Sequence, residues 1–400
     1  MNVFRKAWCR TFQMGMNVVL PLMPYREPKL LDGINGIVKC LKEHNTDNCI
    51  LVTDKGIRGL GLTKPLEELL EKEGIKCCVF DDTVANPTIA NVEAAREMYL
   101  SNGCKAIIAF GGGSSMDCAK GLGARITRPN TSLKKMRGLM KVRKKLPLLI
   151  AVPTTAGTGS ETTVSAVITD GETHFKYVIN DFPLIPEYAA LEPDVTLGLP
   201  GGLTSTTGMD AMTHSVEAFI GHATTKKTRA AAIESVRLII ENLEKVYKDG
   251  SDREARAKML RASYLGGCAF TRSYVGYVHA VAHSLGGQYG VPHGLANAVL
   301  LPHVLEMYGK SAHKKLARLA KAVGLVPESM GTEEAAKAFI AKIKQMNENM
   351  NIPTTIKGIK EEDISMMADH ADKEGNPLYP VPTLWNKEEL EKVYRRVMEK

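Results

Sequence analysis

The chain has 400 residues, of which 44% are hydrophobic and 24% are charged, a balance typical of a globular protein of about two or three domains. This composition excludes a largely disordered or fibrous chain, and no stretch approaches the ~18 apolar residues of a membrane-spanning helix. The formal net charge of +8 raises the question of a nucleic-acid partner, which the position of the charges answers below.

The N-terminal segment has Arg5, Lys6 and Arg10 ahead of an apolar stretch that ends at Pro21–Pro24. It lacks the small-residue cleavage site of a secretion signal, and its prolines favour the entry into a β-strand. The eight cysteines of the chain show no Cys-x-x-Cys spacing, which is typical of a reducing cytosol and argues against a thiolate zinc site. We therefore expect a cytoplasmic protein with no membrane partner.

Up to about residue 200, short β-rich runs alternate with helical patterns. Apolar runs bounded by turn residues predict strands, and apolar residues at helical spacing predict helices between them. The strands are expected at Asn48–Asp54, Lys76–Asp81, Ala106–Phe110 and Leu146–Pro153, and helices at Lys64–Glu73 and Val92–Leu100. This alternation predicts an α/β domain with a parallel sheet, and the almost continuous apolar character of the strands indicates helices on both faces.

A run between residues 134 and 145 carries seven positive charges and no acid, and without it the chain is close to neutral. Its members are Lys134, Lys135, Arg137, Lys141, Arg143, Lys144 and Lys145. Nucleic-acid binders usually combine such a run with aromatic residues or a known motif, and this run has neither, so we expect no nucleic-acid partner. We interpret it as a solvated loop, with the alternative that its field steers an anionic substrate or the cofactor phosphates.

Beyond Leu199–Gly202 the pattern is helical. Long helical patterns are expected at Thr228–Tyr247 and Arg253–Phe270, and amphipathic surface helices at Glu333–Lys344 and Lys387–Glu399. We predict an α/β domain over residues 1–200 and an all-α domain over residues 201–400. A cleft between two such domains is a preferred position for a ligand.

Two loops rich in glycine and hydroxyl residues follow predicted strands. Gly111–Asp117 reads GGGSSMD, and Pro153–Glu161 reads PTTAGTGSE. Glycines let backbone amides approach a pyrophosphate at a helix N-terminus, although GGGSSMD is not the G-x-G-x-x-G fingerprint. Asp54, at the end of another strand, can accept a hydrogen bond from a ribose 2′-hydroxyl and repel a 2′-phosphate. Together these features predict a dinucleotide site that favours NAD over NADP, while each alone also fits an ordinary turn.

A second set of residues has the chemistry of a metal site. Asp210 and His214 are four residues apart and so share one face of a helix. His279, His283 and His293 follow within one stretch rich in glycine and small residues. One carboxylate with neutral imidazoles suits a divalent first-row metal such as Fe²⁺ or Zn²⁺, and three or four such ligands leave a position open for a substrate oxygen.

In these motifs the sequence resembles the iron-containing (group III) alcohol dehydrogenases. The resemblance runs through nearly the whole chain, and its most specific parts are PTTAGTGSE at 153–161, GMDAMTHSVEAF at 208–219 and HAVAHSLGGQYGVPHGLANAVLLPHV at 279–304. It implies the dehydroquinate synthase-like fold of that family, in which an N-terminal α/β dinucleotide-binding domain precedes an all-α C-terminal domain and the metal lies between them.

The resemblance implies a role for each matching position. The metal ligands are then Asp210, His214, His279 and His293, and His283 is a further histidine near the reacting centre. The implied dinucleotide contacts are Asp54, Asn86, Gly112, Gly113, Ser114, Asp117, Thr154, Thr155, Thr158, Lys176 and Thr196. Ser165 and Phe270 fall where the family lines its substrate pocket. The position of Ser165 varies within the family, so it identifies no substrate.

By the same resemblance we expect reversible hydride transfer between nicotinamide C4 of NAD(H) and a small primary alcohol or aldehyde. A bound Fe²⁺, or Zn²⁺, is expected to polarise the substrate oxygen. His283 is expected to pass the proton to solvent, or alternatively to support the metal site. A homodimer or larger homo-oligomer is expected by analogy with the family.

Four alternatives remain open at this point. The basic run, with His370 and Lys373, leaves room for a carboxylated or sulfonated short aldehyde. A zinc-dependent relative such as a glycerol dehydrogenase or dehydroquinate synthase is disfavoured, because those proteins usually lack one of the four ligands. The other two alternatives are a metal-dependent hydrolase and a non-catalytic NAD-binding protein.

Overall fold

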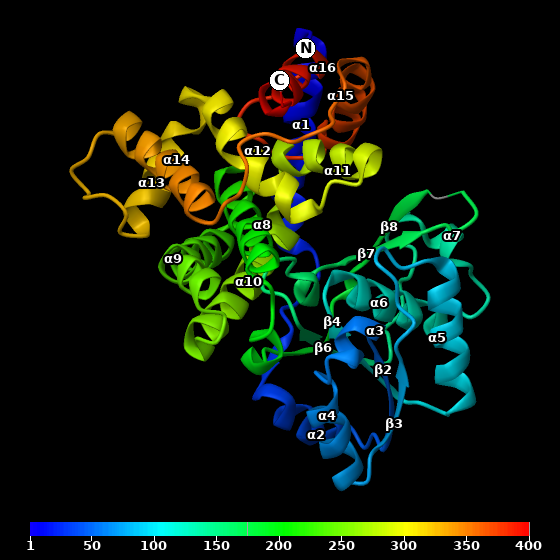
Figure 1. Cartoon of the computed structure of the whole chain (residues 1–400). Helices are drawn as coiled ribbons and strands as arrows, with labels where there is room; N and C mark the ends of the chain where they lie inside the picture. The colour runs from blue at the N-terminus through cyan, green and yellow to red at the C-terminus, as the bar shows by residue number, and fades with distance from the viewer. Residues whose placement is uncertain (174, 400) are drawn as a thin grey trace. The chain divides into compact units, whose positions relative to one another are not determined.

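The computed structural model describes residues 1–173 and 175–399, without the side chain of Pro21. These residues form two compact units (Figure 1), an α/β unit over Pro24–Gly198 and a helical unit that combines Met1–Met23 with Leu199–Lys400. The two units meet in the chain between Gly198 and Leu199, and the first 23 residues belong to the helical unit. We had expected a division at residue 200 with residues 1–23 in the α/β domain.

The N-terminal segment forms a helix where the prolines predicted the entry into a strand. Helix α1 spans Val3–Val19, and Asn2 caps it by accepting a hydrogen bond from the Arg5 amide at 2.8 Å. A short 3₁₀ turn at Leu20–Leu22 follows, and the first strand, β1, begins only at Lys29. The prediction of a strand entry at Pro21–Pro24 is therefore wrong.

The α/β unit is built on a six-stranded sheet with the order β1-β9-β6-β4-β2-β3, in which every pairing is parallel. The strands are β1 (Lys29–Leu31), β2 (Asn48–Val52), β3 (Lys76–Phe80), β4 (Ala106–Gly111), β6 (Leu148–Pro153) and β9 (Tyr188–Ala190). Successive side chains of one strand enter different cores: Ile107 packs in one hydrophobic cluster and Ile108 in the other. The predicted parallel sheet with both faces covered is confirmed.

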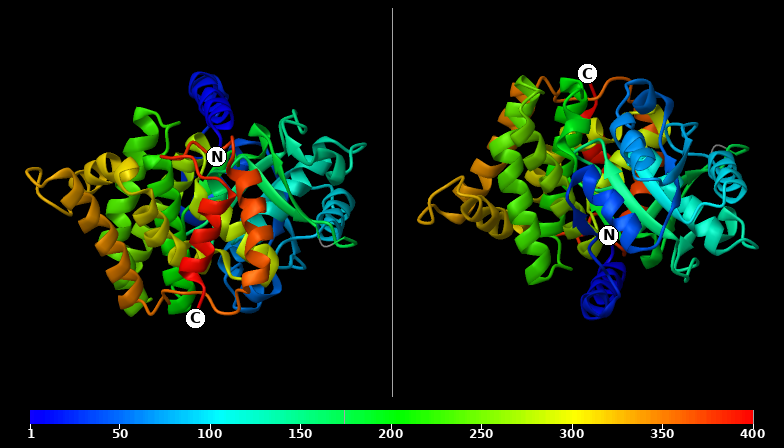
Figure 2. Two further views of the ribbon diagram at one scale, coloured as in Figure 1. Left: turned by 90° about the horizontal axis from the view of Figure 1, so that it is seen from above. Right: turned by 90° about the horizontal axis from the view of Figure 1, so that it is seen from below.

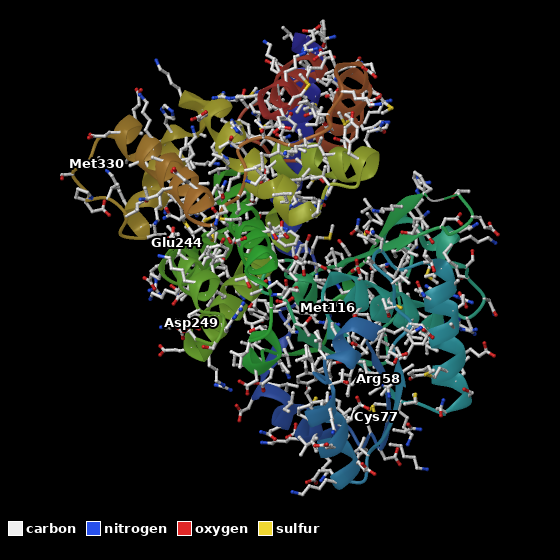
Figure 3. All side chains as sticks on the ribbon, viewed as in Figure 1. Arg58, Cys77, Met116, Glu244, Asp249 and Met330 are labelled. Carbon is white, nitrogen blue, oxygen red and sulfur yellow. The ribbon has the colours of Figure 1, made fainter. Side chains whose placement is uncertain are left out.

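Two layers of helices provide these cores. Helices α2 (Gly33–Glu43) and α4 (Lys64–Lys72) cover one face, and α5 (Ile89–Ser101) and α6 (Gly113–Thr127) cover the other. Met116 of α6, labelled in Figure 3, is 1% exposed and belongs to the second core. The short helix α3 (Lys55–Gly59) follows β2 directly.

A three-stranded sheet, with the order β5-β8-β7, completes the α/β unit. Its strands are β5 (Gly138–Leu139), β7 (Ser165–Thr169) and β8 (Lys176–Asn180), and short helices occur at Leu133–Met136 (α7), Ser160–Thr162 (η2), Phe182–Leu184 (η3) and Pro193–Thr196 (η4). The basic run crosses α7 and β5 and is only partly the solvated loop we expected. Lys134 pairs with Asp170 at 2.8 Å and Glu172 at 3.0 Å, and Lys145 pairs with Glu187 at 3.2 Å.

In the helical unit, α8 is the buried central helix, packed against α9, α10 and α12. The helices after the boundary are α8 (Gly201–Ile220), α9 (Lys226–Lys248), α10 (Arg253–Ser273), α11 (Tyr277–Tyr289), α12 (His293–Tyr308), α13 (Lys310–Ala322), α14 (Thr332–Asn349), α15 (Glu361–Gly375) and α16 (Lys387–Val397). The predicted helical character of this half is confirmed. Within the part of the chain that the structure describes, none of the helices is long and apolar enough to span a bilayer.

Candidate active site

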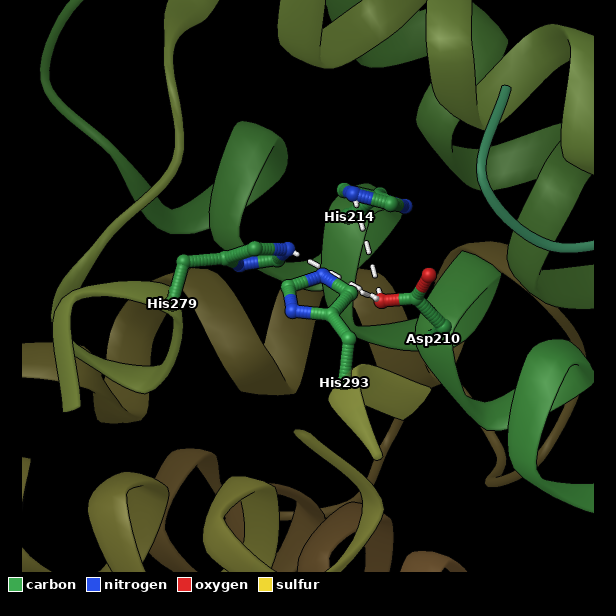
Figure 4. A group of neighbouring side chains, drawn as sticks. All are labelled: Asp210, His214, His279 and His293. Carbon is green, nitrogen blue, oxygen red and sulfur yellow. Dashed lines mark ion pairs between the residues drawn. The ribbon is translucent and has the colours of Figure 1, made fainter. Parts of the chain in front are cut away.

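Three helices of the helical unit bring the four predicted metal ligands together. Asp210 and His214 lie one turn apart on α8, His279 lies on α11, and His293 is the first residue of α12. One ligand atom from each lies within 4.8 Å of the others (Figure 4). His293 is the most exposed of the four, with 41% of its side chain accessible, so this cluster is open on the His293 side.

The arrangement of donors and acceptors inside the cluster suits a cation. The amide nitrogen of Asn297 donates to Asp210 Oδ1 at 2.7 Å and lies 3.2 Å from His279 Nε2 and 3.1 Å from His293 Nε2. One carboxylate oxygen and two ring nitrogens therefore converge on one amide group, whose hydrogens carry partial positive charge. A divalent ion needs the same convergence of a carboxylate oxygen and imidazole nitrogens, so these residues fit such an ion.

A buried carboxylate orients one of the imidazoles. Glu217, one turn beyond His214 on α8, accepts a hydrogen bond from His279 Nδ1 at 2.6 Å. It also accepts from the backbone amides of Gly276 and Val278, each at 2.8 Å. With its proton on Nδ1, His279 presents the lone pair of Nε2 to the cluster, as second-shell carboxylates arrange for metal-binding histidines.

The environment of this pair controls its charge. Burial raises the pKa of Glu217 to about 8 against the effect of its backbone donors. Burial is the main cause that lowers the pKa of His279 well below its usual value, and the charges of the neighbouring histidines lower it further. The ring is therefore held in the neutral form that binds metals. A Cβ on Gly276 would lie 2.6 Å from Glu217 Oε1, which explains why glycine occupies this position.

His283 lies beside the four-residue cluster. Its ring stacks on His293 with 5.3 Å between centroids, and its Nδ1 donates to Glu374 Oε1 at 2.7 Å. The hydroxyl of Tyr379 donates to the same oxygen at 2.7 Å, which fixes the carboxylate. Of the two predicted substrate-lining residues, Phe270 belongs to this unit. Its ring stacks on that of His214, with 4.1 Å between the ring centroids.

In the α/β unit, the two glycine-rich loops lie side by side at the carboxyl ends of adjacent parallel strands. Gly111 at the end of β4 pairs with Pro153 at the end of β6. A Cβ on Gly112 would lie 3.7 Å from Thr155 Oγ1, and one on Gly113 would lie 3.6 Å from Thr158 Cγ2. Gly112 caps α6, so the backbone amides at the start of this helix are presented beside the second loop.

Comparison with known proteins identifies the family. The family model described as "Iron-containing alcohol dehydrogenase" matches residues 32–193, and "Fe-containing alcohol dehydrogenase family, C-terminal" matches residues 204–398. The chain belongs to the iron-containing alcohol dehydrogenase family. It is therefore an oxidoreductase, as the resemblance implied. Residues 1–31, which include α1, lie outside both matches.

Individual relatives agree with this membership. The chain is 40% identical to the 1,3-propanediol dehydrogenase of Citrobacter freundii over 352 residues, which cover 87% of this chain and 90% of the relative. A crystal structure of 1,3-propanediol oxidoreductase matches with a TM-score of 0.88 and 37% identity, over 93% of this chain and 99% of that one. The sulfoacetaldehyde reductase of Bifidobacterium kashiwanohense, solved with NAD⁺, matches with a TM-score of 0.83 and 25% identity, over 94% and 99%.

Two further residues that were predicted to contact the dinucleotide also lie in the α/β unit of this alcohol dehydrogenase family member. Asp54 follows β2, and its Oδ1 accepts from the Ile57 amide at 2.9 Å, so the residue also serves as the cap of α3. Asn86 has a positive φ of 58°, and its amide donates to Ser114 Oγ at 3.2 Å. The role of Asp54 as a helix cap is thus compatible with its predicted contact to the cofactor.

The remaining predicted contacts lie at varied places in the α/β unit. Thr154 donates its amide to Gly111 at 3.1 Å, and Asp117 accepts from Ser160 Oγ at 3.4 Å. Thr196 is buried and bonds back to the carbonyl of Pro193, whereas Lys176 is exposed at the start of β8. Ser165 begins β7, and its hydroxyl donates to Asn180. Their cofactor and substrate roles stay predictions.

The α/β unit also contains a buried lysine that sequence reasoning missed. Lys120 of α6 is fully buried, and its Nζ donates to Ser160 O at 2.7 Å, Thr163 O at 3.0 Å and Ser165 O at 2.9 Å. Burial lowers its pKa to about 8. The lysine therefore ties the loop that follows β6 to the helix that begins at the glycine loop.

Close to this lysine lies a second missed residue, Glu161, which is 1% exposed and has no hydrogen-bond partner for either carboxylate oxygen. Burial raises the pKa of Glu161 to about 7, although the charge of Lys120 opposes the shift. Glu217 and Asn297 were missed in the same way. A charged or amide residue inside an otherwise apolar, small-residue motif is the feature that would have pointed to all four.

Proposed function

We propose that this protein is an NAD(H)-dependent and metal-dependent alcohol dehydrogenase that reversibly transfers hydride between nicotinamide C4 and the carbon of a small primary alcohol or aldehyde. The observation that carries the proposal is the convergence of Asp210, His214, His279 and His293 within 4.8 Å. The orientation of His279 by Glu217 supports it, because a carboxylate that accepts from Nδ1 leaves Nε2 free to bind a metal.

A divalent ion held by these four side chains would supply Lewis acidity at the oxygen of the bound alcohol or aldehyde. We propose Fe²⁺ as the native ion. Zn²⁺ suits the same ligands, so analysis of protein purified without oxygen is the measurement that separates the two metals.

We assign the proton transfer to His283. The Nδ1–H group of His283 donates a hydrogen bond to Glu374. This leaves Nε2 of His283 to exchange a proton with the substrate or with water. Phe270, stacked on His214, supplies an apolar wall beside the ligands. The test is His283→Ala, which should keep the metal and lose about 10²–10⁴ in rate; loss of the metal would show that His283 only supports the cluster.

For the cofactor, we propose that the amides at Gly112–Ser114 and the hydroxyls of the second loop hold the pyrophosphate of NAD(H), with the other predicted contacts around them. We propose that Asp54 selects NAD over NADP at the ribose. Replacing Asp54 by glycine should relax the choice toward NADPH, measured as the ratio of kcat/KM values for the two cofactors. Unchanged discrimination would remove Asp54 from the site.

For the substrate, we propose short neutral aldehydes and diol-derived aldehydes. The names of the 1,3-propanediol relatives agree with this class, while the sulfoacetaldehyde reductase keeps an anionic aldehyde as the second candidate. Part of the positive charge that could attract an anion is neutralised, because Lys134, Lys145 and Lys373 pair with acids of the same chain.

The deciding experiment follows NADH absorbance in metal-loaded enzyme with neutral and anionic aldehydes of matched length. We expect oxidation of NADH with the neutral series and higher kcat/KM values there. Higher kcat/KM values for the anionic series would reverse the substrate assignment. No absorbance change with any aldehyde would overturn the proposed reaction.

We also propose that the enzyme is cytoplasmic and homo-oligomeric. All eight cysteines are free thiols, which fits a reducing compartment. The oligomer is proposed by analogy with the family.

A further inference from the structure

Helix α1 is attached to the helical unit by its polar side. Gln13 is 2% exposed, and its amide donates to the carbonyl of Tyr379 at 2.7 Å. The guanidinium of Arg10 donates to the carbonyl of Val381 at 2.9 Å, and Arg5 forms an ion pair with Asp372 at 2.8 Å. These directional contacts to buried or half-buried acceptors fix which face of the helix points inward.

The opposite face of α1 is apolar and points away from the unit. Phe4 is 88% exposed, Trp8 61% and Val18 69%, and at about 100° per residue the three fall within an arc of roughly 80° that also holds the exposed Thr11 and Gly15. Leu22, 81% exposed, continues this face on the 3₁₀ turn. We call these four residues the outer face of α1. Surface helices normally have the reverse arrangement, with the apolar stripe against the protein.

Figure 2 shows the same helix, in dark blue near the label N, standing out from the other helices of its unit in both views. Exposed apolar residues that occur singly need no explanation, but several large aromatic and aliphatic side chains on the same side of one helix mark a surface that binds something. Because α1 lies outside both family matches, the catalytic fold shared by the family does not account for it.

The charge of the segment indicates the chemistry of the occupant. Residues 1–26 contain no aspartate or glutamate, and they contain four basic residues, Arg5, Lys6, Arg10 and Arg26. Arg5 is neutralised by its ion pair with Asp372, so the excess positive charge comes from Lys6, Arg10 and Arg26. A helix with Trp and Phe on one side and only basic charge around it is the pattern that lies in the interface of an anionic bilayer. Basic residues near such a surface each contribute attraction to anionic lipids.

A second copy of the chain is the less suitable occupant. A helix of 17 residues is about 26 Å long, and a stripe about 10 Å wide along two such helices buries only about 500 Å² in total. Stable interfaces bury about 1,200 Å² or more. Pairing two α1 helices would also bring two wholly basic segments together.

We propose that α1 docks the protein on the surface of an anionic lipid bilayer, with the outer face inserted at the boundary between headgroups and acyl chains. The helix lies on the membrane and does not cross it. This differs from the sequence-based expectation of no membrane partner, which concerned spanning segments. It is independent of the proposed reaction.

The two tryptophans of the chain make the test direct. Trp8 is 61% exposed on the outer face, and Trp385 is 5% exposed in the interior of the unit. The full-length protein is mixed with vesicles of pure phosphatidylcholine or of phosphatidylcholine with phosphatidylglycerol. With the anionic vesicles we expect sedimentation with the lipid, a blue shift of the fluorescence and quenching by brominated lipid, all weakened by salt.

Three variants complete the experiment. Phe4→Ser with Trp8→Ser should lower the partition into anionic vesicles about tenfold or more, since two large apolar side chains no longer insert. Leu100→Ser removes an apolar residue that is 53% exposed on α5, and it should change nothing. Trp8→Phe should keep binding and abolish the fluorescence shift. All variants should retain the circular dichroism spectrum and the dehydrogenase activity of the parent.

The outcomes that would overturn the proposal are distinct. Failure to bind either vesicle, or equal binding to both, would refute an anionic bilayer as the occupant. Light scattering without lipid provides the remaining outcome: if the parent is larger than the Phe4→Ser, Trp8→Ser variant by a whole number of copies, a second chain covers the outer face instead.

Discussion

The candidate metal site of the helical unit and the candidate dinucleotide site of the α/β unit are built by opposite means. In the helical unit the site consists of side chains, because a carboxylate and three imidazoles converge from three helices and a buried Glu217 orients one of them. In the α/β unit it consists mainly of backbone, because the glycine loop lacks side chains where two loops approach each other. The first kind of site fails when atoms are removed, and the second fails when a single methyl group is added.

The largest effect is expected from Asp210→Ala, which removes the only carboxylate of the ligand cluster. The metal should be lost, and kcat/KM should fall at least about a thousandfold, since metal assistance is worth several kcal/mol. Metal content after anaerobic loading and kcat/KM are the measurements. His370→Ala, an exposed histidine on α15, is the control and should retain both. Full metal content in the Asp210 variant would show that the cluster is not the metal site.

Glu217→Gln tests the orienting contact without removing a ligand. A glutamine amide presents donor hydrogens where Glu217 accepts from His279 and the backbone, so the ring should turn away from the cluster. We expect metal affinity to fall about 10–100-fold, the usual effect of losing such a partner. Competition with a chelator measures it, and Glu234→Gln on the surface of α9 is the control. Unchanged affinity would leave Glu217 a purely structural residue.

In the α/β unit, we expect NADH binding to be sensitive to an added methyl group. Gly111 has a φ of 154°, and a Cβ there would lie 2.4 Å from Ser115 Oγ. Gly111→Ala should therefore weaken NADH binding about tenfold, which is about 1.4 kcal/mol, while the metal content stays unchanged. Gly171→Ala, where nothing lies within 4 Å of the added methyl, is the control. Equal NADH affinity in the two variants would contradict a site made of backbone.

The smallest effect concerns stability and pH. The folded state raises the pKa of Glu161 from 4.5 to about 7, so it holds the proton more tightly than the unfolded state does. Stability should therefore fall as pH rises from about 4.5 to about 7 and remain lower above that range. The shift corresponds to at most about 3 kcal/mol at 1.36 kcal/mol per unit.

Glu161→Gln removes this ionisation. We expect a gain of about 1 kcal/mol over the parent near pH 8 and none near pH 5, because the amide still lacks hydrogen-bond partners. Urea unfolding at both pH values measures the difference, with the exposed Glu68→Gln as the control. An equal gain at both pH values would show that ionisation is not the cause.

Much of the fold could be predicted from the sequence where one physical pattern dominates. The strands β2, β4 and β6 were predicted within about two residues, because both of their faces are buried and their sequences are continuously apolar. The long helices α9 and α10 were predicted from the helical spacing of their apolar residues. The antiparallel pair of β7 and β8 was missed, because apolar residues such as Val167 and Val178 also occupy the outward positions of these short strands and hide the alternation in the sequence.

The site was predictable in part. The spacing of Asp210 and His214 places them on one helix face, whereas the meeting of α8 with α11 and α12 depends on packing that no local pattern encodes. Glu217 was within reach, since it lies one turn beyond His214 in a helix that is otherwise almost uncharged. Lys120 and Glu161 are likewise charged residues within or next to motifs of small residues, but which groups they would meet depends on the packing of α6 against the loop after β6. Helix α1 was not predicted, because the prolines that follow it favoured the entry into a strand. A helix whose apolar face points outward also does not fit the usual amphipathic pattern.

The contacts of α1 also set an order of events during synthesis. The acceptors for Gln13 and Arg10 come 366 and 371 residues later in the chain. At ~5–20 residues per second, a ribosome needs roughly 20–70 seconds to make that length. Throughout this interval the first helix cannot complete its packing, while Phe4 and Trp8 are accessible from the start. A nascent chain could thus meet a chaperone or a lipid surface before its own C-terminal helices exist.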